Sequence, residues 1–214
     1  MRMINGFDFV FFSELTLLEQ NVYYEKCFRF VRRLRWEYPD FVKWFGNLFQ
    51  LPPRLRPERE IVFCRMNHEV AGIAILKKNA EEQKICTLRV DKRYQRMSIG
   101  KNLMELSFEW LENEKPLITV HKSRQPEFER LFQHYGFELD DQKWGYYRLF
   151  STELAYNGEL PEKAFGLNRF EIADMYEVIS EFIQRGIYDT EQMYHRYVEL
   201  WIRKNLYLQK GMLS

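Results

Sequence analysis

The chain is poor in cysteine, has no long hydrophobic run and carries almost no net charge. Its three cysteines, Cys27, Cys64 and Cys86, form no CxxC pair and no cluster with histidine, so we expect no metal site and no disulfide framework, and a cytoplasmic location. The longest apolar stretch near the N-terminus, residues 7–12, is far too short for a membrane span or a signal peptide. With 32 basic and 31 acidic side chains, no overall field attracts nucleic acid or an anionic membrane. Any anion site must therefore be local.

Apolar side chains are abundant, which excludes an intrinsically disordered chain. Hydrophobic residues make up 46% of the 214 positions, and aromatic residues make up 17%. That much apolar surface offsets the conformational entropy lost on folding, so we expect a globular protein. The length allows one large domain or one ordinary domain with an appendage, because domains cluster at roughly 100 to 200 residues.

Hydrophobic periodicity predicts helices alternating with strands, which is typical of an α/β protein. In the first helix, apolar residues that include Leu18 and Val22 follow helical spacing. A hairpin is expected with its turn at Asn67 and His68, and another across residues 140–143. The predicted strands are 7–12, 61–64, 70–76, 85–90, 116–120, 136–139 and 144–150, and the predicted helices are 14–35, 40–49, 99–111 and 127–135.

The segment from Leu88 to Leu103 is the most informative part of the sequence. A strand leads through a tight polar turn directly into a helix, so backbone N–H groups at the helix start converge where the helix dipole is positive. Such a start is an anion site, and Gly100 allows a phosphate to approach the backbone. Positive charge suited to a polyphosphate comes from Lys92, Arg93, Arg96 and Lys101. The alternative is a plain strand-to-helix turn with a solvated basic rim.

This segment resembles motif A of the GNAT superfamily of acyl-CoA N-acyltransferases, whose signature is Arg or Gln, two residues, Gly, one residue, then Gly or Ala. Gln95, Ser98 and Gly100 occupy the three signature positions. Downstream, residues 131–137 resemble the family's helix that ends in Gly-Phe, here Gly136 and Phe137. The resemblance implies a mixed, mostly antiparallel sheet flanked by helices over residues 1–150.

The resemblance also implies that the chain binds an acyl-CoA, with acetyl-CoA as the expected co-substrate. The backbone at Leu88 and Val90 would follow the pantetheine arm. Ser98 stands where the family has glycine, and a positive φ there would cost about 1 kcal/mol. The pyrophosphate would lie on the amides of the turn and helix start, namely Gln95, Arg96, Met97, Ser98, Ile99, Gly100 and Lys101.

The usual proton donor of the family is missing from its expected place. Many members have a tyrosine four residues before the Gly-Phe glycine, where it protonates the CoA thiolate, but this chain has Phe132. A phenyl ring has no proton to give. His121, at the end of a predicted strand near the expected cleft, is the candidate catalytic residue, because histidine titrates in the useful range. The alternative is an ordinary exposed histidine at a strand end.

Residues 151–214 are expected to form a linker and a two-helix C-terminal hairpin outside the acyltransferase domain. Asn168 and Thr190 are candidate N-caps, and Gly186 separates the two helices. A hairpin this small does not bury its apolar faces alone, so it must dock on its own core, on a second subunit in a homodimer, or along the acceptor groove.

The resemblance implies an N-acetyltransferase of the GNAT type that transfers the acetyl group of acetyl-CoA to an amine. The sequence does not identify this amine. Two alternatives compete with it. One is a non-catalytic acyl-CoA-binding or interaction module, which Phe132 and Ser98 favour. The other is a toxin-like acetyltransferase acting on aminoacyl-tRNA, suggested by basic residues in two groups, Arg29, Arg32, Arg33 and Arg35, and Arg54, Arg56 and Arg59.

Overall fold

The computed structural model describes residues 2–50, 54–148, 150–161, 169–189, 192–193, 195–197 and 199–200. Its strands are β1 (Arg2–Ile4), β2 (Phe7–Phe11), β3 (Phe49–Gln50), β4 (Arg54–Leu55), β5 (Arg59–Met66), β6 (Glu69–Lys78), β7 (Gln83–Val90), β8 (Leu117–His121), β9 (Leu139–Trp144) and β10 (Thr152–Tyr156). Its α-helices are α1 (Leu17–Val31), α2 (Phe41–Gly46), α3 (Ile99–Leu111), α4 (Gln125–Tyr135) and α5 (Arg169–Gln184). Short 3-10 helices are η1 (Phe12–Glu14), η2 (Arg32–Trp36), η3 (Lys92–Tyr94) and η4 (Lys122–Arg124).

A single eight-stranded sheet organises the described part of the chain, in the order β1-β2-β5-β6-β7-β8-β10-β9. Its strands pair antiparallel except β7 and β8, which are parallel and are joined through α3. The expected mixed, mostly antiparallel sheet flanked by helices is therefore confirmed. Strands β3 and β4 form a separate two-stranded sheet.

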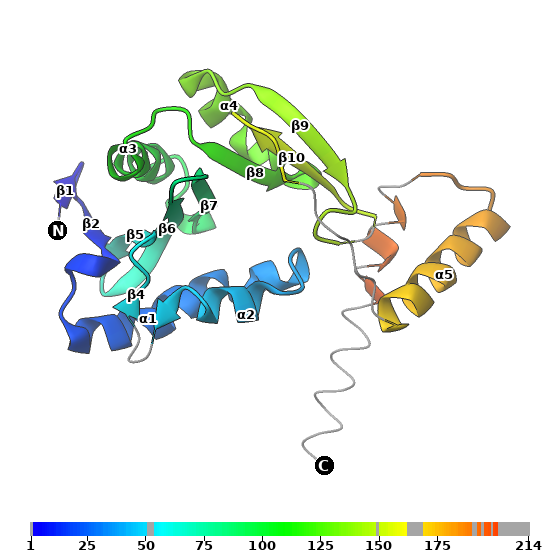
Figure 1. Ribbon diagram of the computed structural model, residues 1–214, viewed down its shortest axis with the longest axis horizontal. Helices are drawn as coiled ribbons and strands as arrows, with labels where there is room; N and C mark the ends of the chain where they lie inside the picture. The colour runs from blue at the N-terminus through cyan, green and yellow to red at the C-terminus, as the bar shows by residue number, and fades with distance from the viewer. Residues whose placement is uncertain are drawn as a thin grey trace, which may run out of the picture.

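The sheet has a hydrophobic core on each face. One core joins α3 and α4 to alternate residues of the central strands, such as Val62, Ala74 and Leu76. The other joins α1 and α2 to the intervening residues, such as Phe63 and Ile73. Because successive strand residues point to opposite faces, each central strand contributes to both cores. Figure 1 shows α1 and α2 along one side of the strands and α3 on the other.

The local turn and cap signals are realised where the sequence predicts them. Asn67 and His68 take φ values of 48° and 64° and close the hairpin between β5 and β6, as a tight hairpin turn requires. Helix α3 begins at Ile99 as expected. Gly136 ends α4 with φ 60°, and the N–H of Phe137 bonds back to the carbonyl of Phe132.

The buried face of α1 differs from the apolar spacing in the sequence. Leu18 is 77% exposed and Val22 is 48% exposed, whereas Tyr23, Cys27 and Val31 are buried. These three recur every four residues, so they form one stripe on the helix. Tyr23 packs on a sheet phenylalanine, Phe63, with ring centroids 4.8 Å apart. Packing against the aromatic core therefore sets the rotation of α1.

The predicted end of the sheet is wrong. Residues 139–144, expected to contain a turn, form the single strand β9, and the described residues 145–148 and 150–151 belong to a turn in place of a strand. Gly145 and Phe150 both have positive φ, as a tight reversal requires. Strand β9 lies at the sheet edge and is largely exposed, so it lacks the apolar alternation that identifies a strand.

Strand β10, Thr152–Tyr156, pairs with both β8 and β9. The sheet therefore extends beyond residue 150, where the acyltransferase domain was expected to end. The sequence did not predict that β10 lies between β8 and β9, because the residues after 150 were expected to form a linker.

The first C-terminal helix is confirmed, and Gly186 follows it with φ 65°. Val178 and Phe182 are buried, whereas Ile183 is 54% exposed. Val178 and Phe182 form a small core with Phe150 of the β9–β10 turn, so α5 packs on its own chain there. In Figure 1 α5 lies beside the end of the β9–β10 hairpin. The expected caps Asn168 and Thr190 lie outside the described residues.

Gly72 on β6 permits the close approach of α3, which yields the first prediction. A Cβ at this position would lie 2.8 Å from Ile99 Cγ2 and 3.1 Å from Leu103 Cδ1, both fully buried. Gly72→Ala should lower the free energy of unfolding by about 1–3 kcal/mol through overpacking, as measured by urea denaturation. The matched control is Gly46→Ala at the end of α2, where a Cβ meets nothing within 4 Å. Equal stability of the two variants would contradict close packing at Gly72.

Candidate active site

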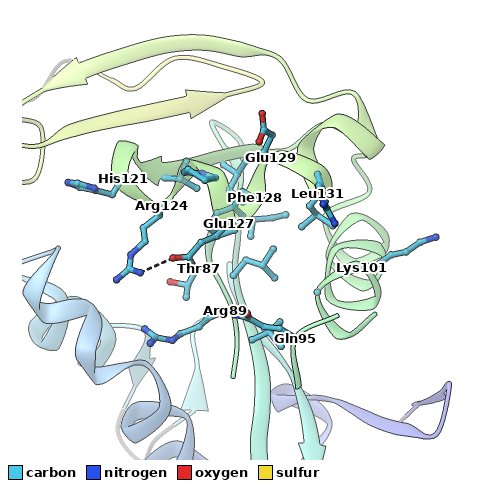
Figure 2. Close-up of a pocket in the computed structure, with 18 of the residues that line it drawn as sticks. Thr87, Arg89, Gln95, Lys101, His121, Arg124, Glu127, Phe128, Glu129 and Leu131 are labelled. Atoms are coloured by element: carbon cyan, nitrogen blue, oxygen red, sulfur yellow. Dashed lines mark hydrogen bonds and ion pairs between the residues drawn. The ribbon is translucent and has the colours of Figure 1, made fainter. Parts of the chain in front are cut away.

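The separation of β7 from β8 opens a cleft in the sheet. The two strands pair only at Lys84–Leu117 and Ile85–Ile118. Beyond these pairs a cavity of about 860 Å³ lies between the ends of both strands, the start of α3 and helix α4. Figure 2 shows side chains from all four elements directed around this space.

A β-bulge at Cys86 determines which side chains face each side of the cleft. Ile75 pairs with Thr87 and Leu76 with Ile85, so Cys86 is the extra residue on β7. Leu88 and Val90 consequently pack with Ile85 on the α3 side of the sheet. The alternation of the strand then directs Thr87 and Arg89 to the α1 side.

The expected phosphate-binding segment forms the α3 end of the cavity. Arg96 and Ser98 take φ values of 65° and 62°, and Asp91 accepts a hydrogen bond from the Arg93 amide at 2.9 Å. Ser98 therefore does adopt the left-handed conformation, at a cost of about 1 kcal/mol. The first N–H groups of α3 have no acceptor within the helix, so they are available to an anion.

The structure brings most of the predicted cofactor-binding residues to the cavity wall. The lining includes Leu88, Val90, Gln95, Arg96, Ser98, Gly100 and Lys101. Met97 is 48% exposed and Ile99 is fully buried in the core, and neither side chain lines the cavity. At Gly100 a Cβ would lie 3.7 Å from Val90 Cγ2, an ordinary contact. The fold therefore tolerates a side chain there.

Positive charge predominates along the cavity wall, which suits a polyanionic ligand. Arg93, expected among these cations, instead pairs with Asp91 at 2.8 Å and lies outside the lining. The basic residues of the lining are Arg89, Lys92, Arg96, Lys101, Arg124 and Arg130, and the acidic ones are Glu37, Glu127 and Glu129.

His121 lies at the end of β8, where it lines the same cavity and is 5% exposed. The backbone N–H of Ser123 donates to its Nδ1 at 3.2 Å, and the Ser123 hydroxyl lies 2.8 Å from the same atom. A neutral ring that accepts at Nδ1 carries its proton on Nε2. In Figure 2 His121 lies on the side of the cavity opposite Lys101.

A buried carboxylate beside His121 was not predicted from the sequence. Glu153 of β10 is directly opposite His121 in the β8–β10 register and is 2% exposed. Burial raises its pKa to about 8, although hydrogen bonds with Thr119 and Tyr38 oppose the shift. Glu153 fell in the segment expected to be a linker, so no sequence signal identified it.

Tyr38 connects Glu153 to the cleft. Its hydroxyl donates to Glu153 Oε1 at 3.2 Å, and its ring packs edge-on against Tyr147 at 5.0 Å. Burial and the neighbouring carboxylates raise the pKa of Tyr38 well above its ordinary value. Tyr38 lines both the large cavity and an adjoining cavity of about 230 Å³, walled by residues that include Phe41 and Trp44. It therefore stands where the two cavities meet.

Phe132, which stands where the resemblance places a tyrosine, belongs to the core. It is 3% exposed, stacks on Phe137 with centroids 5.4 Å apart and contacts Tyr156 at 4.4 Å. The cavity lining includes Phe128 and Leu131 from the same helix but not Phe132. The helical phase of α4 turns this position toward the sheet.

Residues 49–144, from β3 to the end of β9, match the family model described as the acetyltransferase (GNAT) domain. No curated protein sequence matches the chain. Among the described residues no helix is long and apolar enough to cross a membrane.

Several solved acetyltransferase structures are similar at low identity. A GNAT-family acetyltransferase from Streptococcus pneumoniae is 14% identical, with 70% of this chain and 98% of that chain covered at a TM-score of 0.46. The ribosomal-protein-S18-alanine N-acetyltransferase from Escherichia coli is 19% identical, covering 52% and 77% at 0.40. A GNAT acetyltransferase from Elizabethkingia anophelis with acetyl-CoA bound is 20% identical, covering 46% and 74% at 0.37.

The raised pKa of Glu153 predicts how stability depends on pH. The folded-state pKa of about 8 exceeds the unfolded value near 4.5, so the folded state holds this proton more tightly. The free energy of unfolding should therefore fall as pH rises through this window. The glutamine of Glu153→Gln does not titrate. The free energy of unfolding of this variant, relative to that of the natural protein, should therefore increase by about 1–3 kcal/mol as the pH rises from 5 to 8.5.

Urea denaturation at pH 5, 6.5 and 8.5 measures this difference. Glu114→Gln, at an exposed position after α3, is the control and should follow the natural protein. A constant difference between Glu153→Gln and the natural protein at all three pH values would show that Glu153 ionises normally.

Proposed function

We propose that this chain, which is a GNAT-type acetyltransferase by the domain at residues 49–144, transfers the acetyl group of acetyl-CoA to an amine. The observation that carries the proposal is the cleft through the sheet, with the start of α3 on one side and the cluster of Tyr38, His121 and Glu153 on the other. A bound thioester held between them would be accessible to an amine from the α1 side.

The α3 side of the cleft suits the CoA moiety. The amides between Gln95 and Lys101 would bind the pyrophosphate, aided by the side chains of Lys92, Arg96 and Lys101. Beyond Ile85 the backbone of β7 has no hydrogen-bonding partner on β8. That free strand edge would offer N–H and C=O groups to the amides of the pantetheine arm.

The polar cluster suits the chemical step. The amine nitrogen would attack the thioester carbon, so that a C–N bond forms, the C–S bond breaks, the nitrogen loses a proton and the thiolate gains one. Holding the two reactants together in the cleft supplies much of the acceleration. The α1 side of the sheet carries the groups available for proton transfer, Tyr38, His121 and Glu153.

Tyr38 is our candidate for the residue that gives a proton to the thiolate. It would take the role of the tyrosine that many GNAT members have at the position of Phe132. Burial and the neighbouring carboxylates raise the pKa of Tyr38, so the phenol stays protonated and has a proton to give. Glu153 accepts the Tyr38 hydrogen bond at 3.2 Å and would hold the phenol in place beside the cleft. His121, with its proton on Nε2, is the second candidate.

Gly100→Val tests the phosphate site. The added side chain would cover the helix-start amides while meeting little protein, since a Cβ has only Val90 within 4 Å. We expect a folded variant whose dissociation constant for acetyl-CoA rises tenfold or more, about 1.4 kcal/mol, by calorimetry. Unchanged affinity in a folded Gly100→Val protein would place the pyrophosphate elsewhere.

Tyr38→Phe tests the proton donor. The variant should lower kcat about 10²-fold or more while acetyl-CoA affinity stays the same, in an assay of thiol release with a panel of amines. The control is Tyr176→Phe on α5, at a 63% exposed position. Loss of rate in His121→Asn with normal rate in Tyr38→Phe would transfer the role to His121. Acetyl-CoA binding without turnover of any amine would favour the non-catalytic alternative.

A further inference from the structure

Arg89 is a cation in the cleft that the acetyl-transfer chemistry does not use. It lies near the end of β7, is half-buried and lines the large cavity. The bulge at Cys86 turns it to the α1 side of the sheet, away from Leu88 and Val90. Figure 2 shows its guanidinium on the same side of the cavity as that of Arg124, opposite Lys101.

Among the described residues, no carboxylate makes an ion pair with Arg89, and no side chain hydrogen-bonds its guanidinium. Arg124, in contrast, pairs with Glu37 and with Glu127, each at 2.8 Å. Burial lowers the pKa of Arg89, yet an arginine stays protonated in proteins. A partly desolvated cation that forms no direct ion pair with the described residues is unfavourable, so its guanidinium is available to an anion.

The surroundings of Arg89 suit a carboxylate. The carboxylates that act on it most strongly, Glu37 and Glu127, are both paired with Arg124 at 2.8 Å. The two oxygens of a ligand carboxylate match the fork of the remaining guanidinium.

We propose that the acceptor amine carries a carboxylate and that Arg89 binds this carboxylate on the α1 side of the cleft. The inference rests on the proposed acetyl transfer and names the class of its acceptor, an amino acid or another amine with a nearby carboxylate. CoA phosphates are the other source of negative charge. Their expected site lies at the α3 start with Lys101, across the cavity from Arg89 in Figure 2.

Arg89→Gln, Arg89→Lys and a matched control test the assignment. The control is Arg29→Gln, which removes the same charge from an exposed position of α1 where the guanidinium bonds only to its own helix at Glu25. The acceptors are a panel of α-amino acids, each paired with its carboxamide, in a thiol-release assay. Binding of the corresponding N-acetyl amino acids and their amides is measured by calorimetry with and without CoA, which needs no turnover.

The natural protein and Arg29→Gln should prefer the carboxylate member of a pair by tenfold or more in kcat/KM. Arg89→Gln should lose that preference, with unchanged rates on amides and unchanged acetyl-CoA affinity. Arg89→Lys should retain part of it, because lysine keeps the charge but not the fork. In calorimetry the N-acetyl carboxylates should bind tenfold more weakly to Arg89→Gln.

Three results would overturn the inference. Weaker acetyl-CoA binding in Arg89→Gln with unchanged acceptor preference would assign Arg89 to the CoA phosphates. Equal turnover of amides and acids by the natural protein would remove the carboxylate while leaving acetyl transfer intact. The absence of carboxylate-dependent binding and turnover across the panel would reject the site. Failure of the proposed function itself has a separate signature, no acetyl-CoA affinity.

Discussion

The short parallel pairing between β7 and β8 is the constraint on which the candidate site depends. After two residue pairs, at Lys84–Leu117 and Ile85–Ile118, the strands diverge, and the rest of β7 pairs with β6 but not with β8. A continuous parallel ladder would have filled this space with hydrogen bonds. The bulge at Cys86, directly after the last pair, bends β7 and increases its local twist at this point. One interruption in the ladder thus provides both a cavity and a free strand edge.

The same interruption separates two kinds of chemistry onto the two faces of the sheet. The α3 side has a helix start, two residues with positive φ and a basic rim, which together suit phosphate groups. The α1 side has Arg89, Tyr38 and Glu153, which suit recognition of an acceptor and transfer of protons. Because the cavity runs between the diverging strands, a thioester placed in it would meet both sets.

Features encoded by neighbouring residues were predictable from the sequence. The β5–β6 turn at Asn67 and His68, the start of α3 and the α4 end at Gly136 each depend on local backbone preferences. Features that depend on packing were not. The rotation of α1 follows its contact with the sheet, and β9 has the composition of a loop because an edge strand needs no apolar face. Phe132 occupies the family's tyrosine position, yet its ring is part of the core.

By itself the sequence determined the strand-turn-helix segment and its resemblance to the GNAT motif, because strand, turn, glycine and helix are contiguous between Leu88 and Leu103. Tertiary structure alone decided the α1 side of the cleft. Tyr38 and Glu153 are 115 positions apart and come together only when β10 enters the sheet beside β8. Arg89 is adjacent to the motif, but its direction depends on the bulge, and the fold pairs Glu37 and Glu127 with Arg124 instead. Local preferences act over a few residues, whereas burial and charge balance arise from segments that only the fold brings together.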